Sequence, residues 1–189
     1  MIAIKNSQYI TAQEYLEWEE KQPIKYEYID GEIIAITGVT IPHSEITANL
    51  TTALKNHLRG KGCKVLVADA KVEISEQGPF FYPDVMVSCD ERDKKARKAI
   101  EYPCLIIEVL SPGTESFDRG KKFQNYRRIS TLKEYVLVSA NEIMLECFRL
   151  NEKGVWEFYS YLEGDNIELK SVNLSFPIDL IYEDVFLGE

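Results

Sequence analysis

The sequence predicts a single mixed α/β domain over residues 1–189, built around a sheet that combines parallel and antiparallel strands. Two short apolar runs, 104–110 and 132–138, are joined by a helical segment, which is the pattern of a parallel β-α-β crossover. On both sides of this unit, strands separated by tight turns predict antiparallel pairs. The expected core order is helix, strand, strand, strand, helix, strand, with antiparallel additions at both ends.

Composition and charge limit the class of protein. A chain of 189 residues with 45% hydrophobic residues can bury one core. No apolar run approaches the roughly 18–20 residues of a membrane span, and the N-terminus lacks a signal-peptide pattern, so we expect a cytoplasmic protein. The net charge of −9 weighs against a general nucleic-acid binder. It does not exclude a nuclease, because basic residues cluster at 92–98 and 119–128, although solvated surface charge explains the first cluster better than the second.

Two helices are expected in the first third of the chain. Residues 11–18 begin with Thr11 and carry Glu14 three positions later, a capping box that predicts a short amphipathic helix. Residues 41–58 have one apolar stripe at helical spacing. His43 lies at the start of this second helix, on or near the stripe.

A hairpin is expected between these helices. Asp30 and Gly31 separate two apolar runs within residues 26–36, which favours a tight primed turn. Glu27 and Glu32 are then expected to be exposed strand acids. The alternative is that Glu27 reaches a functional site.

Two strand-like segments follow the second helix. Residues 64–74 read as one strand, in which Asp69 is either an outer ligand or, more simply, an acid at a strand end or bulge. Residues 80–88 form a second apolar run, with Asp84 directly before its most hydrophobic part. Asp84 is therefore a candidate site residue.

The segment 104–110 is a short apolar run bounded by prolines, which predicts a strand buried on both faces. Glu108 lies in the middle of this run. A buried carboxylate costs several kcal/mol unless a metal, a cation or several donors contact it. If this strand neighbours that of Asp84, the two carboxylates converge, and a hard divalent cation such as Mg²⁺ relieves their repulsion.

The helical segment after this strand supplies a cation. Its apolar stripe consists of Phe123, Tyr126 and Ile129. At about 100° per residue, Lys122 falls inside the arc of this stripe and Lys121 falls on the opposite side. Lys122 is therefore expected to point at the sheet, with Asp118 one turn before it on the edge of the same face.

The C-terminal third predicts an antiparallel meander. Its expected strands are 143–150, 155–162 and 167–174. Trp156, Phe158 and Tyr159 lie close together there and suggest a homodimer interface, unless they fill the core.

The four cysteines show no metal-finger spacing. Cys63, Cys89, Cys104 and Cys147 contain no Cys-x-x-Cys pair, so we expect reduced structural thiols rather than disulfides or zinc ligands.

These residues resemble a known family. The sequence is similar to the Uma-two family of the PD-(D/E)XK nuclease superfamily, from about residue 26 to the C-terminus. The resemblance rests on Pro83-Asp84, Glu108-Val-Leu-Ser-Pro112, Asp118-Arg-Gly-Lys-Lys122 and Tyr126. It implies a restriction-endonuclease-like fold, a magnesium-dependent nuclease activity and DNA as the substrate.

One departure from the superfamily pattern concerns its lysine. The third motif is Glu-x-Lys, whereas Leu110 stands at the lysine position here. In this branch a lysine of the following helix takes the role, which implies Lys122. The superfamily also places an acid on the first core helix, but helical spacing turns Glu45 towards solvent, so that role stays unassigned. His43 matches a histidine of the family and is either an orienting site residue or a structural one.

The resemblance implies a specific division of roles. Asp84, Glu108 and the backbone carbonyl of Val109 would hold Mg²⁺, or Mn²⁺ in its place. Lys122 would position water or stabilise developing charge, and Asp118 would orient Lys122 or bind a second ion.

Two alternatives to the nuclease remain open. The first is a catalytically inactive nuclease-fold module for protein or nucleic-acid interaction, which the acidic net charge and the missing third-motif lysine favour. The second is a buried structural ion pair among the same residues without a ligand.

Overall fold

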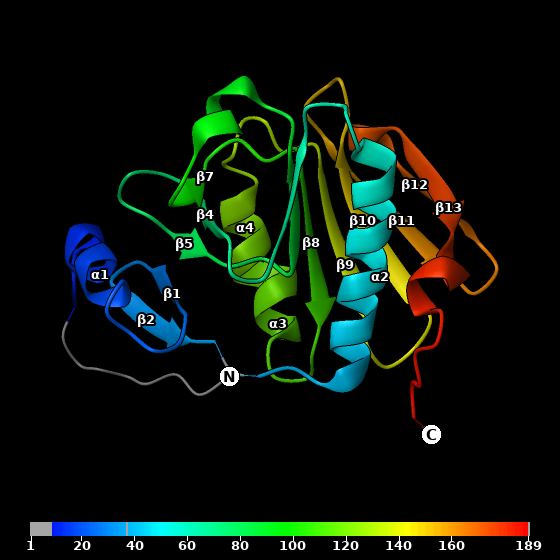
Figure 1. Ribbon diagram of the computed structural model, residues 1–189, viewed down its shortest axis with the longest axis horizontal. Helices are drawn as coiled ribbons and strands as arrows, with labels where there is room; N and C mark the ends of the chain where they lie inside the picture. Colours follow the sequence, from blue (N-terminus) through cyan, green and yellow to red (C-terminus); the bar gives the residue numbers. More distant parts are fainter. Residues whose placement is uncertain (1–8, 37, 189) are drawn as a thin grey trace.

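The computed structural model describes residues 9–36 and 38–188, and its main feature is a six-stranded mixed sheet (Figure 1). Its strands are β3 (Lys64–Val67), β6 (Val85–Ser88), β8 (Leu105–Leu110), β9 (Glu134–Ser139), β10 (Met144–Leu150) and β11 (Trp156–Leu162). They lie in the order β11-β10-β9-β8-β6-β3. The pair β8 and β9 is parallel and the other pairs are antiparallel, which confirms the predicted crossover.

A second sheet of short strands lies beside the first. Its strands are β1 (Tyr26–Ile29), β2 (Glu32–Ala35), β4 (Lys71–Glu73), β5 (Phe80–Phe81) and β7 (Ala99–Ile100), in the order β2-β1-β5-β4-β7. Asp30 and Gly31 both have positive φ, as the predicted primed turn between β1 and β2 requires. Helix α1 (Ala12–Glu19) begins at the predicted capping box and packs on this sheet.

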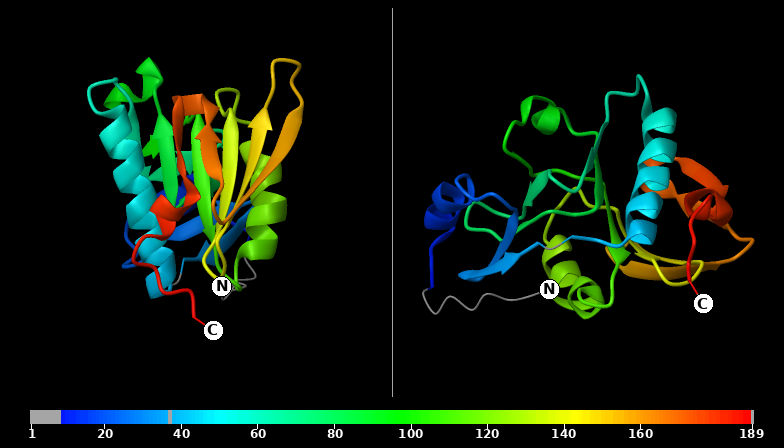
Figure 2. Two further views of the ribbon diagram at one scale, coloured as in Figure 1. Left: turned by 90° about the vertical axis from the view of Figure 1, so that its right-hand side faces the viewer. Right: turned by 60° about the horizontal axis from the view of Figure 1, so that its bottom comes forward.

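Helices cover both faces of the six-stranded sheet (Figure 2). Helix α2 (Ile41–Leu58) packs on one face, where Ile46 and Leu50 meet Ile107 of β8. The other face is covered by α3 (Glu115–Phe117), a π-helical turn (Asp118–Lys122) and α4 (Phe123–Tyr126). Because side chains alternate along a strand, Glu108 shares its face with Ile106 and points at this second helical segment.

The C-terminal region differs from the predicted three-stranded meander. Strands β10 and β11 form as expected, but residues 167–174 do not continue the sheet. Instead β12 (Asn166–Leu169) and β13 (Leu174–Pro177) make a separate hairpin, linked by a short 3₁₀ turn and followed by another (Ile178–Tyr182). The buried carboxylate of Glu134 accepts hydrogen bonds from the Ser171 backbone N–H (2.8 Å) and from Arg149 Nε (2.6 Å), which anchors this hairpin to β9.

Two segments predicted as single strands are each divided between the sheets. Residues 64–74 form β3 and β4, separated by a turn in which Ala68 has a φ of +31°. Residues 80–88 form β5 and β6, and Asp84 lies in the link between them. The prediction of continuous strands was wrong because each segment crosses from one sheet to the other.

The expectation of four reduced cysteines was also wrong. Cys63 and Cys89 form a disulfide, whereas Cys104 and Cys147 are free. The cause is strand register, because Lys64 pairs with Ser88 and the residues one step beyond this pair therefore lie opposite each other.

Within residues 9–36 and 38–188, no helix is long and apolar enough to cross a bilayer.

Candidate active site

Asp84 and Glu108 meet at the junction of the two sheets. Val85 pairs with Ile107, so the residues just before β6 lie beside the middle of β8. The Asp84 backbone N–H donates to Glu108 Oε2 (3.3 Å), and the Val109 backbone N–H donates to Asp84 Oδ2 (2.7 Å). The two acids are therefore neighbours, as the sequence predicted.

Lys122 lies among three buried carboxylates. Its Nζ atom is 3.1 Å from Glu108 Oε1, 3.0 Å from Glu27 Oε1 and 3.2 Å from Asp118 Oδ1, and the residue is only 6% exposed. Lys121 instead points outward, 3.5 Å from Asp30. The prediction that Lys122 and not Lys121 faces the sheet is confirmed.

The helical segment itself contains a feature that the sequence pattern did not predict. The turn from Asp118 to Lys122 is π-helical, and both of these residues are buried. Asp118 Oδ1 lies close to Lys122 Nζ without the angle of a hydrogen bond, so this oxygen has no hydrogen-bond partner among the described residues. Such turns are frequent at functional sites.

Glu27 is a site residue that the main sequence interpretation missed. It is 4% exposed, and the Tyr82 backbone N–H donates to its Oε1 atom (3.3 Å). Strand β1 is covered on both faces: Tyr28 packs under α1, while Ile29 packs in the core with Tyr126. Because side chains alternate along a strand, Glu27 lies on the same face of β1 as Ile29. An apolar residue two positions after Glu27 was the sequence signal that could have predicted its burial.

Tyr126 completes the polar contacts of Glu108. Its hydroxyl donates to Glu108 Oε1 (2.8 Å). Burial raises the pKa of Tyr126 well above its usual value, so the phenol stays a neutral donor. Glu108 Oε1 thus accepts hydrogen bonds from both Tyr126 and Lys122.

His43 lies against Asp84. Thr40 caps α2 and fixes its first turn, which places His43 Nε2 3.2 Å from Asp84 Oδ2. His43 is buried, and its Nδ1 atom has no hydrogen-bond partner among the described residues. Of the alternatives left open, the geometry favours an orienting residue for Asp84.

Three other acids lie outside this cluster. Asp69 is exposed in the turn between β3 and β4, which confirms the simpler interpretation of that residue. Glu45 is half-buried on α2 and does not line the cavity of the cluster. Glu32 is exposed, as predicted.

The electrostatics of the cluster are dominated by buried acids. Burial raises the pKa of Glu108 well above its usual value, against the attraction of Lys122. Burial also raises the pKa of Glu27. For Lys122, burial alone would lower the pKa, but Glu108, Glu27 and Asp118 outweigh it and raise the pKa well above normal. Three carboxylates thus share one ammonium group, and the fourth, Asp84, lies beside Glu108 and contacts His43.

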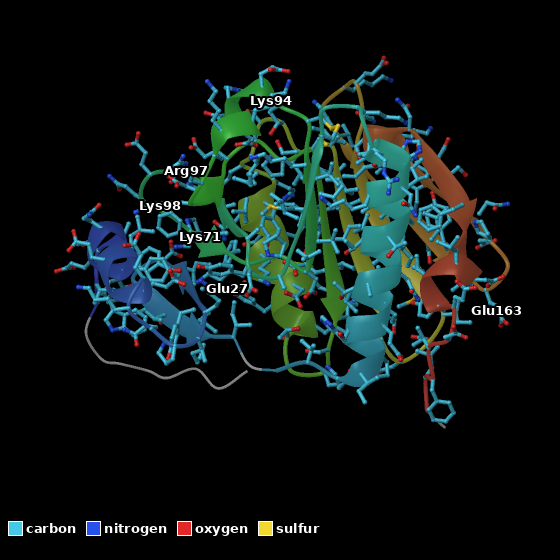
Figure 3. All side chains as sticks on the ribbon, in the orientation of Figure 1. Glu27, Lys71, Lys94, Arg97, Lys98 and Glu163 are labelled. Carbon is cyan, nitrogen blue, oxygen red and sulfur yellow. A yellow bond between two sulfur atoms is a disulfide. The ribbon has the colours of Figure 1, made fainter. Side chains whose placement is uncertain are left out.

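The cluster lines a small cavity of about 140 Å³. Its polar lining comes chiefly from Glu27, His43, Asp84, Glu108, Asp118 and Lys122, and Val109 also borders it. Figure 3 shows Glu27 in the middle of the molecule, below Lys71 and beside the second helical segment. A cavity of this size can hold an ion with a few water molecules.

The donor set fits a hard cation that retains water. Within the described residues, no three His, Cys, Asp or Glu side chains converge as a ready-made metal cluster. Asp84 and Glu108 offer two carboxylates beside Val109, and the excess of carboxylates over ammonium groups in the cluster favours a cation. Mg²⁺ is commonly held by one or two carboxylates and water, so two protein carboxylates are sufficient.

Comparisons with known proteins agree with one another. The model of the Uma2 family, described as "Putative restriction endonuclease", matches residues 12–180. A Synechocystis protein, "Uncharacterized protein slr1290", is 43% identical over 173 residues, covering 92% of this chain and 91% of that protein. Another, "Uncharacterized protein sll1609", is 34% identical over 172 residues, covering 90% and 97%.

A solved structure has the same fold. It is the crystal structure of a putative nuclease belonging to DUF820 from Anabaena variabilis, with a TM-score of 0.77 and 17% identity. The match covers 94% of this chain and 99% of that one. The predicted restriction-endonuclease-like core, with α2, β3, β6, β8, the α3–α4 segment and β9 in the expected order, is confirmed.

Proposed function

Because the chain belongs to the Uma2 family of putative restriction endonucleases, we propose that it is a divalent-metal-dependent endonuclease that hydrolyses phosphodiester bonds in DNA. The observation that carries this proposal is the meeting of Asp84, Glu108 and Lys122 in one buried cavity. These residues come from the link before β6, from β8 and from the π-helical turn that follows it. A set of acids with one lysine is what phosphodiester hydrolysis needs: a site for a cation and a group that stabilises negative charge.

The metal would be held by Asp84, Glu108 and the carbonyl oxygen of Val109. Mg²⁺, or Mn²⁺ in its place, supplies Lewis-acid polarisation of the phosphate and a lowered pKa of bound water. His43 positions Asp84 through the contact of 3.2 Å, so Asp84 keeps its orientation whether or not substrate is present.

Lys122 contributes a fixed positive charge. The three carboxylates around it keep it protonated at neutral pH, so it can orient a water molecule or stabilise charge that develops on the phosphate. Asp118 acts as a positioning residue for this ammonium group, from one helical turn away.

The test is cleavage of supercoiled plasmid DNA with Mg²⁺, Mn²⁺ or EDTA. We expect nicked or linear product from the wild type with metal, and none from Asp84→Asn. The matched control is Asp179→Asn, because Asp179 is an exposed acid in the C-terminal 3₁₀ turn and does not line the cavity of the cluster. Calorimetry with Mn²⁺ checks the metal site separately, and equal heats from the wild type and Asp84→Asn would remove it.

One observation favours a second candidate, a catalytically inactive nuclease-fold module. Glu108 accepts hydrogen bonds from the Asp84 backbone N–H, Lys122 and Tyr126, and Leu110 occupies the usual place of the catalytic lysine. Such a module would bind DNA without cutting it. Binding by the wild type with no product in either metal would select this function.

We also propose that the protein acts as a homodimer. Trp156 packs on Phe123, and Tyr159 lies beneath Arg149, so two of the three aromatics help to fill the interior. Phe158 remains 54% exposed on β11, which ends the six-stranded sheet. Two sites in a dimer could cut both strands of a duplex. Multi-angle light scattering checks this, and a mass near the chain's own 21.8 kDa would rule the dimer out.

A further inference from the structure

A basic groove lies beside the candidate active site. It has a volume of about 540 Å³ and runs between the edge strand β3, the adjacent surface of α2 and the segment that leads into β7. Its charged lining residues are Lys55, Lys64, Asp69, Lys71, Arg97 and Lys98. Five cations and one carboxylate in one groove contrast with the net charge of −9 of the whole chain. We call this feature the β3 groove.

Three of these cations are available to a ligand. Lys55 and Arg97 are exposed and form no ion pair with any described residue, and Lys64 contacts only the carbonyl oxygen of Ala96, at 3.5 Å. The other two are engaged: Lys71 is buried against Glu19, and Lys98 pairs with Glu20 at the surface. Figure 3 shows Lys71, Arg97 and Lys98 on one side of the molecule, above Glu27, whereas Glu163 lies at the opposite end.

The β3 groove comes closest to the acid cluster at the C-terminal end of β3. Val67, the last residue of β3, pairs with Val85, and the Ala68 backbone N–H donates to the carbonyl oxygen of Asp84 (3.1 Å). On the other wall, α2 begins beside Asp84 at His43 and reaches Lys55 twelve residues later, about 18 Å along the helix. The end of the groove at Val67 is therefore the end next to Asp84, whereas Lys64, at the other end of β3, and Lys55 lie farther from the acid cluster.

Two sheet edges border the groove. Strand β3 ends the six-stranded sheet and β7 ends the five-stranded sheet, so each has one side without a strand partner. Backbone N–H groups on such edges contact phosphate oxygens as readily as side chains do. The groove thus combines fixed backbone donors with mobile cations.

We propose that the β3 groove binds the sugar-phosphate backbone of the DNA duplex whose scissile phosphate enters the acid cluster, an inference that rests on the proposed function. A DNA strand carries one phosphate for about every 3.4 Å along the duplex axis, and the groove offers three cations, Lys55, Lys64 and Arg97, that no described acid neutralises. An acidic peptide that adds a strand to β3 is the competing occupant, but five cations with one acid in a groove next to the proposed nuclease site favour the DNA backbone.

The experiment compares duplex binding by the full chain and by two double variants. A labelled duplex of about 30 base pairs is titrated in EDTA, which prevents cleavage, at several salt concentrations. In the groove variant, Lys55→Gln and Arg97→Gln remove two exposed cations. In the control variant, Lys133→Gln and Lys153→Gln remove two exposed lysines that lie away from the groove and form no ion pair with described residues.

We expect the groove variant to bind about tenfold more weakly at low salt, with the slope of log affinity against log salt reduced by about 1.8, or about 0.9 per lost phosphate contact. The control variant should stay within about twofold of the wild type. Thermal unfolding of both variants confirms that they are folded, and Mn²⁺ calorimetry should give the same heats for both as for the wild type.

Three results would overturn the assignment. If the wild type binds and cleaves duplex DNA while the groove variant binds with unchanged affinity and slope, the groove is rejected and the proposed nuclease stands. If poly-L-glutamate binds the wild type as tightly as DNA and loses affinity equally in the groove variant, the groove is a peptide site. If the wild type neither binds nor cleaves DNA, the proposed function fails and the assignment fails with it.

Discussion

Replacing Lys122 by methionine removes the ammonium group that contacts three buried acids, Glu27, Glu108 and Asp118. Methionine fills a similar volume and is flexible, so the change leaves little cavity. Glu27, Glu108 and Asp118, each less than 5% exposed, then face one another without a cation. Removing one partner of a buried ion pair costs about 3–5 kcal/mol. For a domain of this size, that loss lowers the melting temperature by about 6–20 °C.

The penalty should depend on pH in a defined direction. Burial raises the pKa of Glu27 and Glu108 in the folded protein above the value of 4.5 of an ordinary glutamate, and loss of Lys122 raises both further. At pH values between the pKa of these glutamates in the unfolded chain and their pKa in the folded variant, the folded variant binds more protons than the unfolded chain. The stability of the variant therefore falls as pH rises through this range. In the wild type, the contribution of Lys122 is fully present below its unfolded pKa of 10.5, so it does not change between pH 5 and pH 8.

Urea unfolding in EDTA, followed by circular dichroism at pH 5 and pH 8, measures this effect. The destabilisation of Lys122→Met should be larger at pH 8 than at pH 5. Lys121→Met is the matched control, since Lys121 is about half exposed and its surface pair with Asp30 is worth at most about 1 kcal/mol. A variant at Lys122 that is as stable as the wild type at pH 8, or equally destabilised at both pH values, would refute the account of the cluster.

Two further predictions concern parts of the chain outside the cluster. Glu134→Gln should lower the free energy of unfolding, measured in urea, by about 3–5 kcal/mol, because it breaks the buried ion pair with Arg149. The control Glu163→Gln, in an exposed turn, should change this free energy little. Burial raises the pKa of Cys104 to about 11 and that of Cys147 to about 12. A thiol reagent at pH 8 should therefore react slowly with the native protein. The free energy of unfolding should fall above about pH 9, because the thiols ionise at a lower pH in the unfolded chain than in the folded protein. Unfolded protein should titrate two thiols without reductant and four after reduction, and four in both conditions would contradict the disulfide.

Local patterns were sufficient to find three residues of the candidate site. Asp84 and Glu108 stand out because a carboxylate in an apolar run needs a partner wherever the strand is placed. Lys122 follows from helical periodicity, and a π-helical turn did not change the face on which it lies. The order of helices and strands in the core was predictable for the same reason, because the spacing of apolar residues within each segment indicates a helix or a strand.

The remaining features depend on contacts between distant segments. Glu27 is buried because two different elements cover the two faces of β1, and a four-residue strand carries little information about both. The break at Ala68 depends on the division of strands between two sheets. The disulfide depends on the register of β3 against β6, which the spacing of Cys63 and Cys89 cannot supply.

Because Glu27 of β1 belongs to the acid cluster, the choice of fragment matters when this fold is truncated or grafted. The continuous segment from helix α2 to strand β9 contains Asp84, Glu108 and Lys122. By these three residues alone, it is the smallest segment to transplant into another scaffold. A fragment that began at α2 would nevertheless leave Lys122 with two carboxylates instead of three. The hairpin of β1 and β2 is therefore a charge-balancing part of the unit, and shuffling of domains or trimming of the N-terminus has to keep it.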